Sequence, residues 1–256
     1  MKIVSQNFNA WCPVTDLRFS KKIKLFAEYI GNKYPNRAEV ALICIQEFIA
    51  GKNGKYLAEL ESAFDACYDV ITPPNFNEIE HSKSLINVIL IRKDLDYNVI
   101  KFNSCLPNRV CYVRVFFDYL PTPLRIMNIY AVQTVRFPSH AASWYITKRK
   151  EQKEDLWNSV LREAKKCTEP LLICGDMQED SKSGMHIKQL TEIGFKEKNG
   201  GFFPTVKNDL FEAIPNIDHF LYNPAAWENF YPVSFEHDGN LLDELSDHIL
   251  LAAVSA

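Results

Sequence analysis

Short runs of apolar, often β-branched residues alternate along the chain with longer segments in which apolar residues recur every three or four positions. The short runs predict nine β-strands, at residues 2–7, 40–46, 86–93, 97–102, 110–118, 124–132, 170–176, 216–223 and 248–254. The longer segments predict helices at 20–31, with Ser20 as the N-cap, and at 56–66, 139–166 and 183–193. Nine short strands interleaved with helices suit two β-sheets.

No internal repeat, low-complexity tract or Pro/Gly-rich linker divides this pattern. Residues 67–84 contain prolines and asparagines and predict a long surface loop. The chain has 256 residues, of which 47% are hydrophobic, enough for one sizeable core. We therefore expect a single domain over residues 1–256.

Polar side chains stand where predicted strands begin or end. Four lie at trailing ends and two at or just before leading ends: Asn7, Glu47, Tyr130 and Asp176 in the first group, and Asp218 and His248 in the second. Leading and trailing ends meet at one edge only if neighbouring strands run in opposite directions. A shared rim for these six side chains therefore predicts mixed or antiparallel sheets and argues against a purely parallel fold.

Each of these residues also has a structural explanation. Asp176 after a strand is a common turn or helix-capping residue, Tyr130 is an ordinary amphipathic core residue, and Asp218 opens a strand. Glu47 lies between apolar residues, where a buried acid needs a partner or a metal ion. Their convergence on one predicted rim favours a functional site.

Composition limits the partners and the compartment. The chain has 29 basic and 32 acidic residues and a net charge of −3, so the molecule as a whole is no strongly cationic nucleic-acid binder, and a polyanionic substrate needs local positive charge. The seven cysteines lack paired spacing and are expected to be reduced. No run of 18 apolar residues occurs, which predicts a soluble, cytoplasmic protein without a membrane partner.

Six segments resemble the motifs of the endonuclease/exonuclease/phosphatase superfamily in order and approximate spacing. They are SQNFNAW, ICIQEF, MNIYAVQ, LLICGDMQED, NIDHFLYN and LSDHILLA, and they span residues 3–252. The resemblance implies a DNase I-like α/β fold, a four-layer sandwich of two mixed, mostly antiparallel sheets packed face to face with helices outside. It also implies magnesium-dependent hydrolysis of phosphate esters, with manganese as a substitute.

The resemblance assigns roles to the rim residues. Glu47, Asn7 and Asp247 would hold the metal ion, whose preference for hard oxygen ligands they satisfy. Asp176 would orient and deprotonate the attacking water, and Tyr130 would contact the phosphate or the metal shell. Asp218 would fix the imidazole of His248, which would contact a phosphate oxygen.

Several positions depart from the family's pattern. Gln178 stands where an asparagine is usual, Asn9 where aspartate or histidine is common, and AVQ follows the strand where proline and asparagine follow the tyrosine. Pro215 replaces the aromatic residue that walls the sugar pocket of abasic-site nucleases, although Phe203 could keep one wall. Acidic residues around the GD and SDH motifs disfavour highly phosphorylated substrates.

Basic residues gather at 20–24 and 145–153, the second near Arg136 and Trp144, and most of these lysines suit a solvated helix face. The expected function is a magnesium-dependent phosphodiesterase, an endo- or exonuclease acting on DNA or RNA. The alternatives are a small-molecule or lipid phosphodiesterase or phosphatase of the same fold, and a degenerate binding module, for which Gln178 is the main support.

Overall fold

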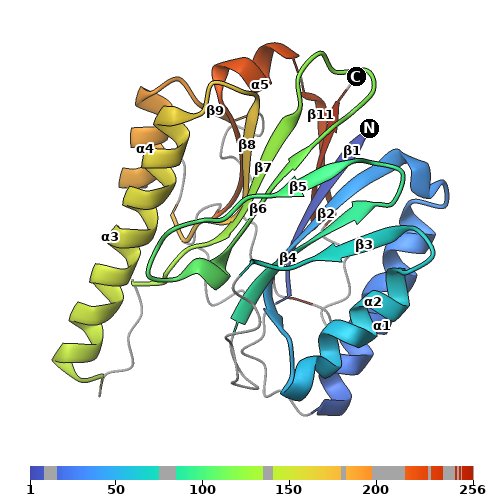
Figure 1. The fold of residues 1–256 in the computed structure, drawn as a ribbon. Coiled ribbons are helices and arrows are strands. Elements are labelled where there is room, and N and C mark those ends of the chain that lie inside the picture. The colour runs from blue at the N-terminus through green and yellow to red at the C-terminus, as the bar shows by residue number, and fades with distance from the viewer. Residues whose placement is uncertain are drawn as a thin grey trace.

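A computed structural model describes residues 1–8, 16–74, 85–134, 141–179, 183–197, 217–229, 232–238, 246, 248 and 250–255. Two β-sheets lie face to face in its centre, with α1 and α2 outside one sheet and α3 and α4 outside the other (Figure 1). The predicted four-layer α/β sandwich is confirmed.

The first sheet has the strand order β11-β12-β1-β2-β4-β3. Its single parallel pair is β1 with β2, and its other neighbours are antiparallel. The strands are β1 (Lys2–Asn7), β2 (Val40–Ile49), β3 (Tyr68–Ile71), β4 (Leu85–Arg92), β11 (Pro232–Asp238) and β12 (Leu250–Ser255). The helices on this side are α1 (Asp16–Lys33) and α2 (Lys55–Phe64), with short 3-10 turns at Arg37–Glu39 and Lys52–Gly54.

The second sheet has the order β5-β6-β7-β8-β10-β9 and likewise holds one parallel pair, β7 with β8. Its strands are β5 (Tyr97–Val99), β6 (Val110–Val115), β7 (Leu124–Tyr130), β8 (Leu171–Asp176), β9 (Lys196–Glu197) and β10 (Asp218–Tyr222). The remaining helices are α3 (Ser143–Lys166), α4 (Met185–Glu192) and α5 (Pro224–Asn229), with a 3-10 turn at Pro107–Arg109 before β6.

Alternating side chains of the strands build three apolar layers. In β2, Ile43 and Ile45 face the helices of their own side, while Leu42 and Cys44 face the second sheet. A third layer packs β7 and β8 against α3, where Trp157 is fully buried. Because both faces of the central strands are buried, they appear in the sequence as short continuous apolar runs, which is how they were detected.

All nine predicted strands occur, but three strands were missed and two local predictions were wrong. Residues 68–71 form β3 rather than part of a loop, because four residues are enough to pair at a sheet edge beside β4. Ser20 lies inside α1 and does not cap it, since the helix already begins at Asp16. The strands β9 and β11 and the short helix α5 carry too few periodic apolar residues to be predicted.

The six cysteines within the described residues are free, as expected, and Cys12 lies outside them. Among the helices the structure describes, none combines the length and the apolar character needed to cross a membrane.

The topology brings the predicted rim together. The parallel pairs β1/β2 and β7/β8 end at the same edge of their sheets, and β10 begins there, with Asp218 opposite Asp176. His248 lies two residues before the start of β12, which runs antiparallel to β1. Leading and trailing strand ends therefore meet at one edge, as predicted.

Candidate active site

Glu47 reaches the rim from a bulge in β2. The register between β2 and β4 shifts between Ile45 and Phe48, and Glu47 has a φ of 53°, in the left-handed region. A non-glycine residue in that region costs about 1 kcal/mol and persists where its surroundings hold it. The bulge redirects the side chain, and a Glu47 carboxylate oxygen accepts a 3.0 Å hydrogen bond from Nδ2 of Asn7 on β1.

Aromatic packing fixes the backbone on both sides of this pair. Phe8 follows Asn7 and Phe48 follows Glu47, and their ring centroids lie 5.9 Å apart in a buried edge-to-face contact. Phe19 of α1 packs against both rings. The two polar rim residues are thus each anchored by a neighbouring side chain in the core.

A buried amide from the opposite sheet holds the strand next to the bulge. Nδ2 of Asn128, on β7, donates to the backbone carbonyls of Ile45 and Val88, each at 2.9 Å, and these two residues are the pair immediately before the register shift. Oδ1 of Asn128 accepts from Nε2 of Gln46 at 2.7 Å. The side chain of Asn128 therefore joins the two sheets at the point where Glu47 is positioned.

Asn128→Leu is expected to lower the free energy of unfolding by about 3 kcal/mol, because the two carbonyls and the Gln46 amide would stay buried without this partner. Urea denaturation measures the loss. Asn98→Leu, at an exposed position of β5, is the matched control and should change stability by less than about 0.5 kcal/mol. Equal unfolding midpoints for the two variants would contradict the role given to Asn128.

Asp176 ends β8 with a fully buried carboxylate that accepts three hydrogen bonds. Oδ2 accepts from Asn7 Nδ2 at 2.8 Å and from Gln178 Nε2 at 2.7 Å, and Oδ1 accepts from the Gln178 backbone N–H at 3.0 Å. Asn7 thereby bridges Glu47 of one sheet and Asp176 of the other. The carboxylate has little freedom to rotate.

Gly175 lets β8 approach the neighbouring strand β7 closely. It lies inside β8 with a φ of 122°, and a Cβ there would collide with the backbone carbonyl of Ile129 on β7. Only glycine combines this conformation with so close an approach of two strands. Gly175 thus allows β7 and β8 to pair directly before Asp176.

Contacts with residues next to and within β10 hold the loop after β8 in place. The Met177 N–H donates to the Ile217 carbonyl at 2.7 Å, and the Glu179 carbonyl lies 2.7 Å from His219 Nε2. Gln178, between them, has a φ of 51°. The amide nitrogen of Gln178 is directed back to Asp176, so this residue positions the carboxylate rather than extending outward to a substrate.

Gln178→Asn is expected to lower kcat by tenfold to about a hundredfold without loss of stability. Asparagine tolerates the left-handed backbone better than glutamine, but its amide is shorter by one bond, about 1.5 Å, and would leave Asp176 Oδ2. Steady-state kinetics of the purified variant measure the effect, with Gln152→Asn on α3 as the control. A tenfold rise in kcat would instead identify Gln178 as a lesion.

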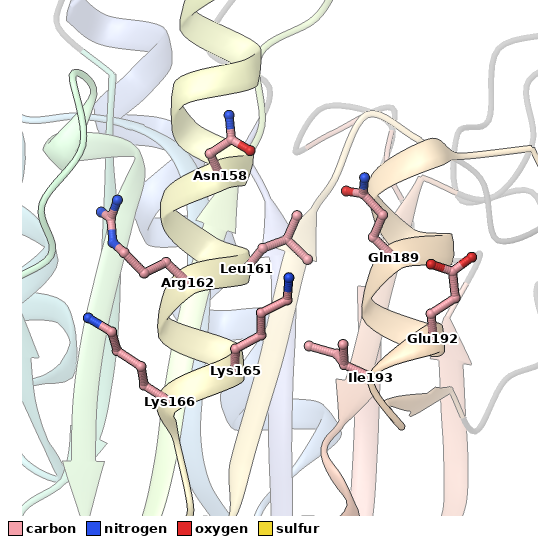
Figure 2. A pocket seen from close by; sticks show the side chains of 8 residues that line it. All are labelled: Asn158, Leu161, Arg162, Lys165, Lys166, Gln189, Glu192 and Ile193. Carbon is pink, nitrogen blue, oxygen red and sulfur yellow. The ribbon is translucent and has the colours of Figure 1, made fainter.

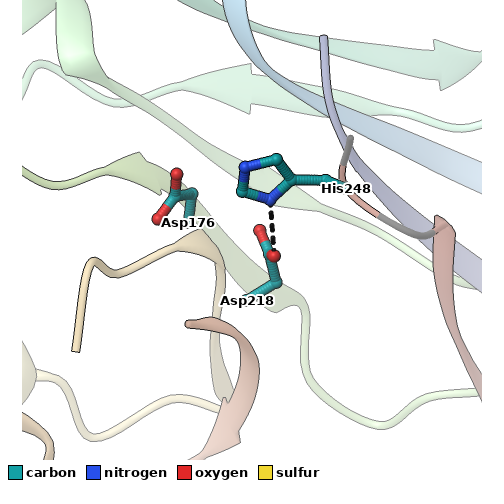
Figure 3. Close-up of side chains that lie close together, drawn as sticks. All are labelled: Asp176, Asp218 and His248. Carbon is teal, nitrogen blue, oxygen red and sulfur yellow. Dashed lines mark hydrogen bonds and ion pairs between the residues drawn. The ribbon is translucent and has the colours of Figure 1, made fainter. Parts of the chain in front are cut away.

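Asp218 and His248 form the second polar unit of the rim. His248 Nδ1 and Asp218 Oδ2 are 2.7 Å apart, and both residues are buried (Figure 3). The His248 N–H donates to the Ser246 hydroxyl at 3.0 Å, which fixes the backbone before β12. Asp176 stands across from this pair, and one ligand atom from each of the three residues lies within 4.8 Å of the others.

The electrostatic surroundings set the proton affinity of Asp176. Burial raises its pKa to about 7, and the charges of Asp218 and Glu47 act in the same direction. His248 and the hydrogen bond from Gln178 lower the pKa but do not outweigh burial. A carboxylate with a pKa near neutrality can accept a proton at physiological pH.

Glu179 fastens the same loop to two helices. Its carboxylate accepts from the His186 backbone N–H in the first turn of α4 at 2.9 Å and lies 2.7 Å from Lys153 Nζ on α3. The His186 ring, 2.6 Å from the same carboxylate, stacks on Trp157. Burial raises the pKa of Glu179, but the hydrogen bonds from His186 and Lys153 prevail and lower it from 4.5 to about 2.

Because the folded-state pKa of Glu179 lies below the unfolded one, its contribution to stability is present above pH 4.5 and is lost as the pH falls toward 2. Glu179→Gln is expected to lower the free energy of unfolding at pH 7 by about 2 kcal/mol and to flatten its decline between these pH values. Denaturation at several pH values, with exposed Glu192→Gln as control, measures this. Parallel profiles for wild type and Glu179→Gln would rule the contribution out.

The structure places most predicted site residues together. Asn7, Glu47, Asp176 and Gln178 form one hydrogen-bonded group, and Asp218 and His248 form the adjoining pair. Tyr130 lies opposite Asp176 in the β7/β8 register. The residues outside the described part of the chain are Asp247, Asn9, Phe203, Pro215 and Arg136.

Sequence reasoning missed Asn128, Gln46 and Arg109. Asn128 and Gln46 interrupt the apolar runs LRIMNIY and ICIQEF, and an amide inside a buried strand is a detectable signal because it requires a hydrogen-bond partner. Arg109 gives no such signal, because it lies in the 3-10 turn before β6 and not within an apolar strand.

The donor atoms at the rim fit a magnesium ion. Glu47 supplies a carboxylate, and Asn7, whose amide nitrogen donates to the two acids, also carries an amide oxygen, a type of ligand that Mg²⁺ accepts. The compact group of Asp176, Asp218 and His248 also has metal-ligand spacing, but it contains an imidazole that is paired with Asp218. Magnesium prefers oxygen donors, so Glu47 and Asn7 suit it better.

A groove of about 540 Å³ lies away from the rim, between the C-terminal half of α3 and α4 (Figure 2). Leu161 and Lys165 of α3 lie on the side that faces Gln189 and Ile193 of α4, whereas Arg162 and Lys166 extend from the other side of α3. It is open to solvent and contains none of the rim residues.

Comparison with known proteins agrees with this arrangement. The model of the Endonuclease/Exonuclease/phosphatase family matches residues 7–248. A sequence search against curated proteins finds no match.

Solved structures share the fold at low sequence identity. An AP endonuclease from Archaeoglobus fulgidus is 16% identical, with 100% of this chain and 99% of the other covered and a TM-score of 0.70. A humanized D. rerio TDP2 is 14% identical over 99% and 97%, with a TM-score of 0.64. The 3' phosphatase NExo from Neisseria, bound to a product DNA hairpin, is 15% identical over 100% and 99%, also with a TM-score of 0.64.

Proposed function

The chain belongs to the endonuclease/exonuclease/phosphatase family of phosphate-ester hydrolases, and from this premise we propose that it is a magnesium-dependent phosphodiesterase acting on nucleic acid. The observation that carries the proposal is the Asp176 carboxylate, held by Asn7 and Gln178 and facing the Asp218–His248 pair. An immobilised carboxylate opposite an oriented imidazole suits the attack of water on a phosphate.

Glu47 and Asn7 would hold the magnesium ion, and Asp247, the residue before His248, would complete the set. When bound, the ion polarises the phosphate and neutralises charge that develops on the leaving oxygen. The left-handed backbone at Glu47 and its bond to Asn7 keep this carboxylate in place before the substrate arrives.

Asp176 would orient the attacking water and accept its proton. Its three hydrogen bonds use the lone pairs directed toward Asn7 and Gln178 and fix the plane of the carboxylate. On the other side of the substrate, Asp218 would accept the Nδ1–H of His248 and orient the imidazole, whose Nε2 would contact a phosphate oxygen. Tyr130, beside Asp176 in the sheet, would contact the phosphate or the metal shell.

Nucleic acid is favoured as the substrate because the structural neighbours include an AP endonuclease and a 3' phosphatase bound to a DNA hairpin. A small-molecule or lipid phosphodiester is the alternative substrate class. The intact hydrogen-bond network around Asp176 argues against a binding module that has lost catalysis.

A substrate panel tests the proposal. Supercoiled plasmid, single-stranded DNA, RNA, abasic duplex and bis(p-nitrophenyl) phosphate are each incubated with magnesium, manganese or EDTA. Cleavage of at least one nucleic acid with either metal, abolished by EDTA, is expected. Hydrolysis of the small diester alone would identify the alternative substrate class, and absence of turnover on every substrate would favour the binding module.

A further inference from the structure

The inward face of α3 is apolar in the C-terminal half of the helix and becomes cationic toward its N-terminus. From Leu156 toward the N-terminus of the helix, Lys153, Arg149 and Ile146 lie at partly buried positions. Spacings of three and four residues place these side chains on one stripe. An amphipathic helix usually has apolar residues there, but this one has two cations.

The two cations differ in their partners. Lys153 pairs with Glu179, whereas Arg149 has no acidic partner among the described residues. Arg149 is half-buried, and burial lowers its pKa, as does the nearby charge of Arg109. Tyr145 and Tyr130 also lie close to Arg149, and their charges act in the opposite direction, to raise its pKa.

Arg109 is the second positive charge at this place and is only 9% exposed. Its guanidinium carbon lies 4.3 Å from the centroid of the Tyr130 ring, and Nη1 donates to the Ala131 carbonyl at 3.1 Å. The part of the chain that the structure describes offers it no carboxylate. By contrast, Arg92, Arg114 and Arg125 each form a salt bridge with Asp94 or Glu169.

Two neighbouring arginines, largely removed from water and without a described acidic partner, are unfavourable until an anion joins them. Guanidinium groups bind phosphate oxygens through paired N–H donors. Because Arg109 stacks on Tyr130 and Tyr130 lies opposite Asp176, the anion would sit directly beside the catalytic rim.

Exposed aromatic rings continue this surface at the start of α3. Trp144 is 69% exposed and Tyr145 is 40% exposed, and the centroids of their rings lie 6.0 Å apart. Tyr145 and Arg149 are four residues apart and so share one face of the helix. The N-terminal end of α3 projects at the lower left of Figure 1. Exposed aromatic rings next to cations are typical of single-strand binding.

We propose that Arg109 and Arg149 form a phosphate-binding subsite that holds a nucleic-acid phosphate flanking the one that is cleaved, with Trp144 stacking on an unpaired base beyond it. The inference rests on the proposed function, because it places a nucleic-acid strand across the same rim. The preferred substrate is therefore single-stranded, or a duplex with an unpaired end.

Binding in EDTA tests the subsite separately from catalysis. Fluorescence anisotropy with a labelled single strand of about twenty nucleotides is followed over a salt series. Arg149→Ala should weaken binding by about tenfold and reduce the slope of log affinity against log salt by about 0.7. Lys150→Ala, which removes an equal charge from the exposed side of the same helix, should change affinity by less than about twofold. Arg149→Gln repeats the test if Arg149→Ala fails to fold.

Two further comparisons fix the substrate. Trp144→Ala should weaken single-strand binding by about tenfold and blunt-duplex binding by much less. Arg149→Ala should lower kcat/KM for the oligonucleotide while leaving that for bis(p-nitrophenyl) phosphate unchanged, because the small diester has no second phosphate. The inference would be overturned if Arg149→Ala and Lys150→Ala bound the strand equally well. It would also be overturned if Arg149→Ala lowered kcat/KM equally for the oligonucleotide and for bis(p-nitrophenyl) phosphate. If the wild type binds the strand in a way that depends on Arg149 but does not cleave it, the proposed function would be wrong while the subsite would stand.

Discussion

Glu47→Gln is expected to reduce turnover by about three orders of magnitude or more while the protein stays folded. Glutamine keeps an oxygen that can accept from Asn7 Nδ2, so the 3.0 Å contact and the bulge survive the substitution. The negative charge that attracts a hard cation is lost. Turnover should recover only in part when magnesium is raised to high concentration.

The matched control is Glu39→Gln, an exposed glutamate directly before β2 whose nearest cation is Lys2 at 3.8 Å. It should leave turnover within about twofold of wild type, because exposed ion pairs contribute little. Circular dichroism and urea denaturation establish that both variants are folded. Wild-type kcat and magnesium dependence in Glu47→Gln would mean that the metal binds elsewhere.

Asp218→Ala and His248→Ala are each expected to lower kcat/KM by about a thousandfold, and the double variant should be little worse than the poorer single one. The 2.7 Å bond between them makes the two side chains one unit, since Asp218 acts only by fixing the imidazole. Multiplicative losses in the double variant would show that they act separately.

The neighbouring pair of His219 and Glu197 provides the control. His219 follows Asp218 in β10, is fully buried, and lies 2.6 Å from Glu197, but its other ring nitrogen is held by the Glu179 carbonyl. His219→Ala should therefore lower stability, and the protein that remains folded should keep most of its turnover. A loss as large as that of His248→Ala would show that the assay reports folding and not the site.

The two-sheet fold could be predicted because the central strands are short continuous apolar runs with a polar residue at or near their ends. The ends of KIVSQN and LLICGD predicted that Asn7 and Asp176 share a rim, and the structure joins them by one hydrogen bond. The short edge strands β3 and β9 were missed because pairing with a longer neighbour, rather than their own composition, creates them.

The means of holding the site were less accessible from the sequence. Nothing local in ICIQEF reveals that Glu47 sits on a bulge, because the bulge depends on Asn128, some 80 residues away and in the other sheet. The direction of the Gln178 amide likewise follows from a backbone conformation that the residue type does not favour. Arg109 becomes notable only through its contact with Tyr130.

The most direct test of the central claim is single-turnover cleavage of a labelled oligonucleotide by wild type and by Asp176→Asn, each with magnesium and with EDTA. Asparagine keeps the shape of the side chain but cannot accept the proton of water. Rapid cleavage by wild type with magnesium, none in EDTA, and a rate lower by about a thousandfold in Asp176→Asn are predicted. Undiminished cleavage in EDTA, or by Asp176→Asn, would contradict metal-assisted attack by a water molecule held at Asp176.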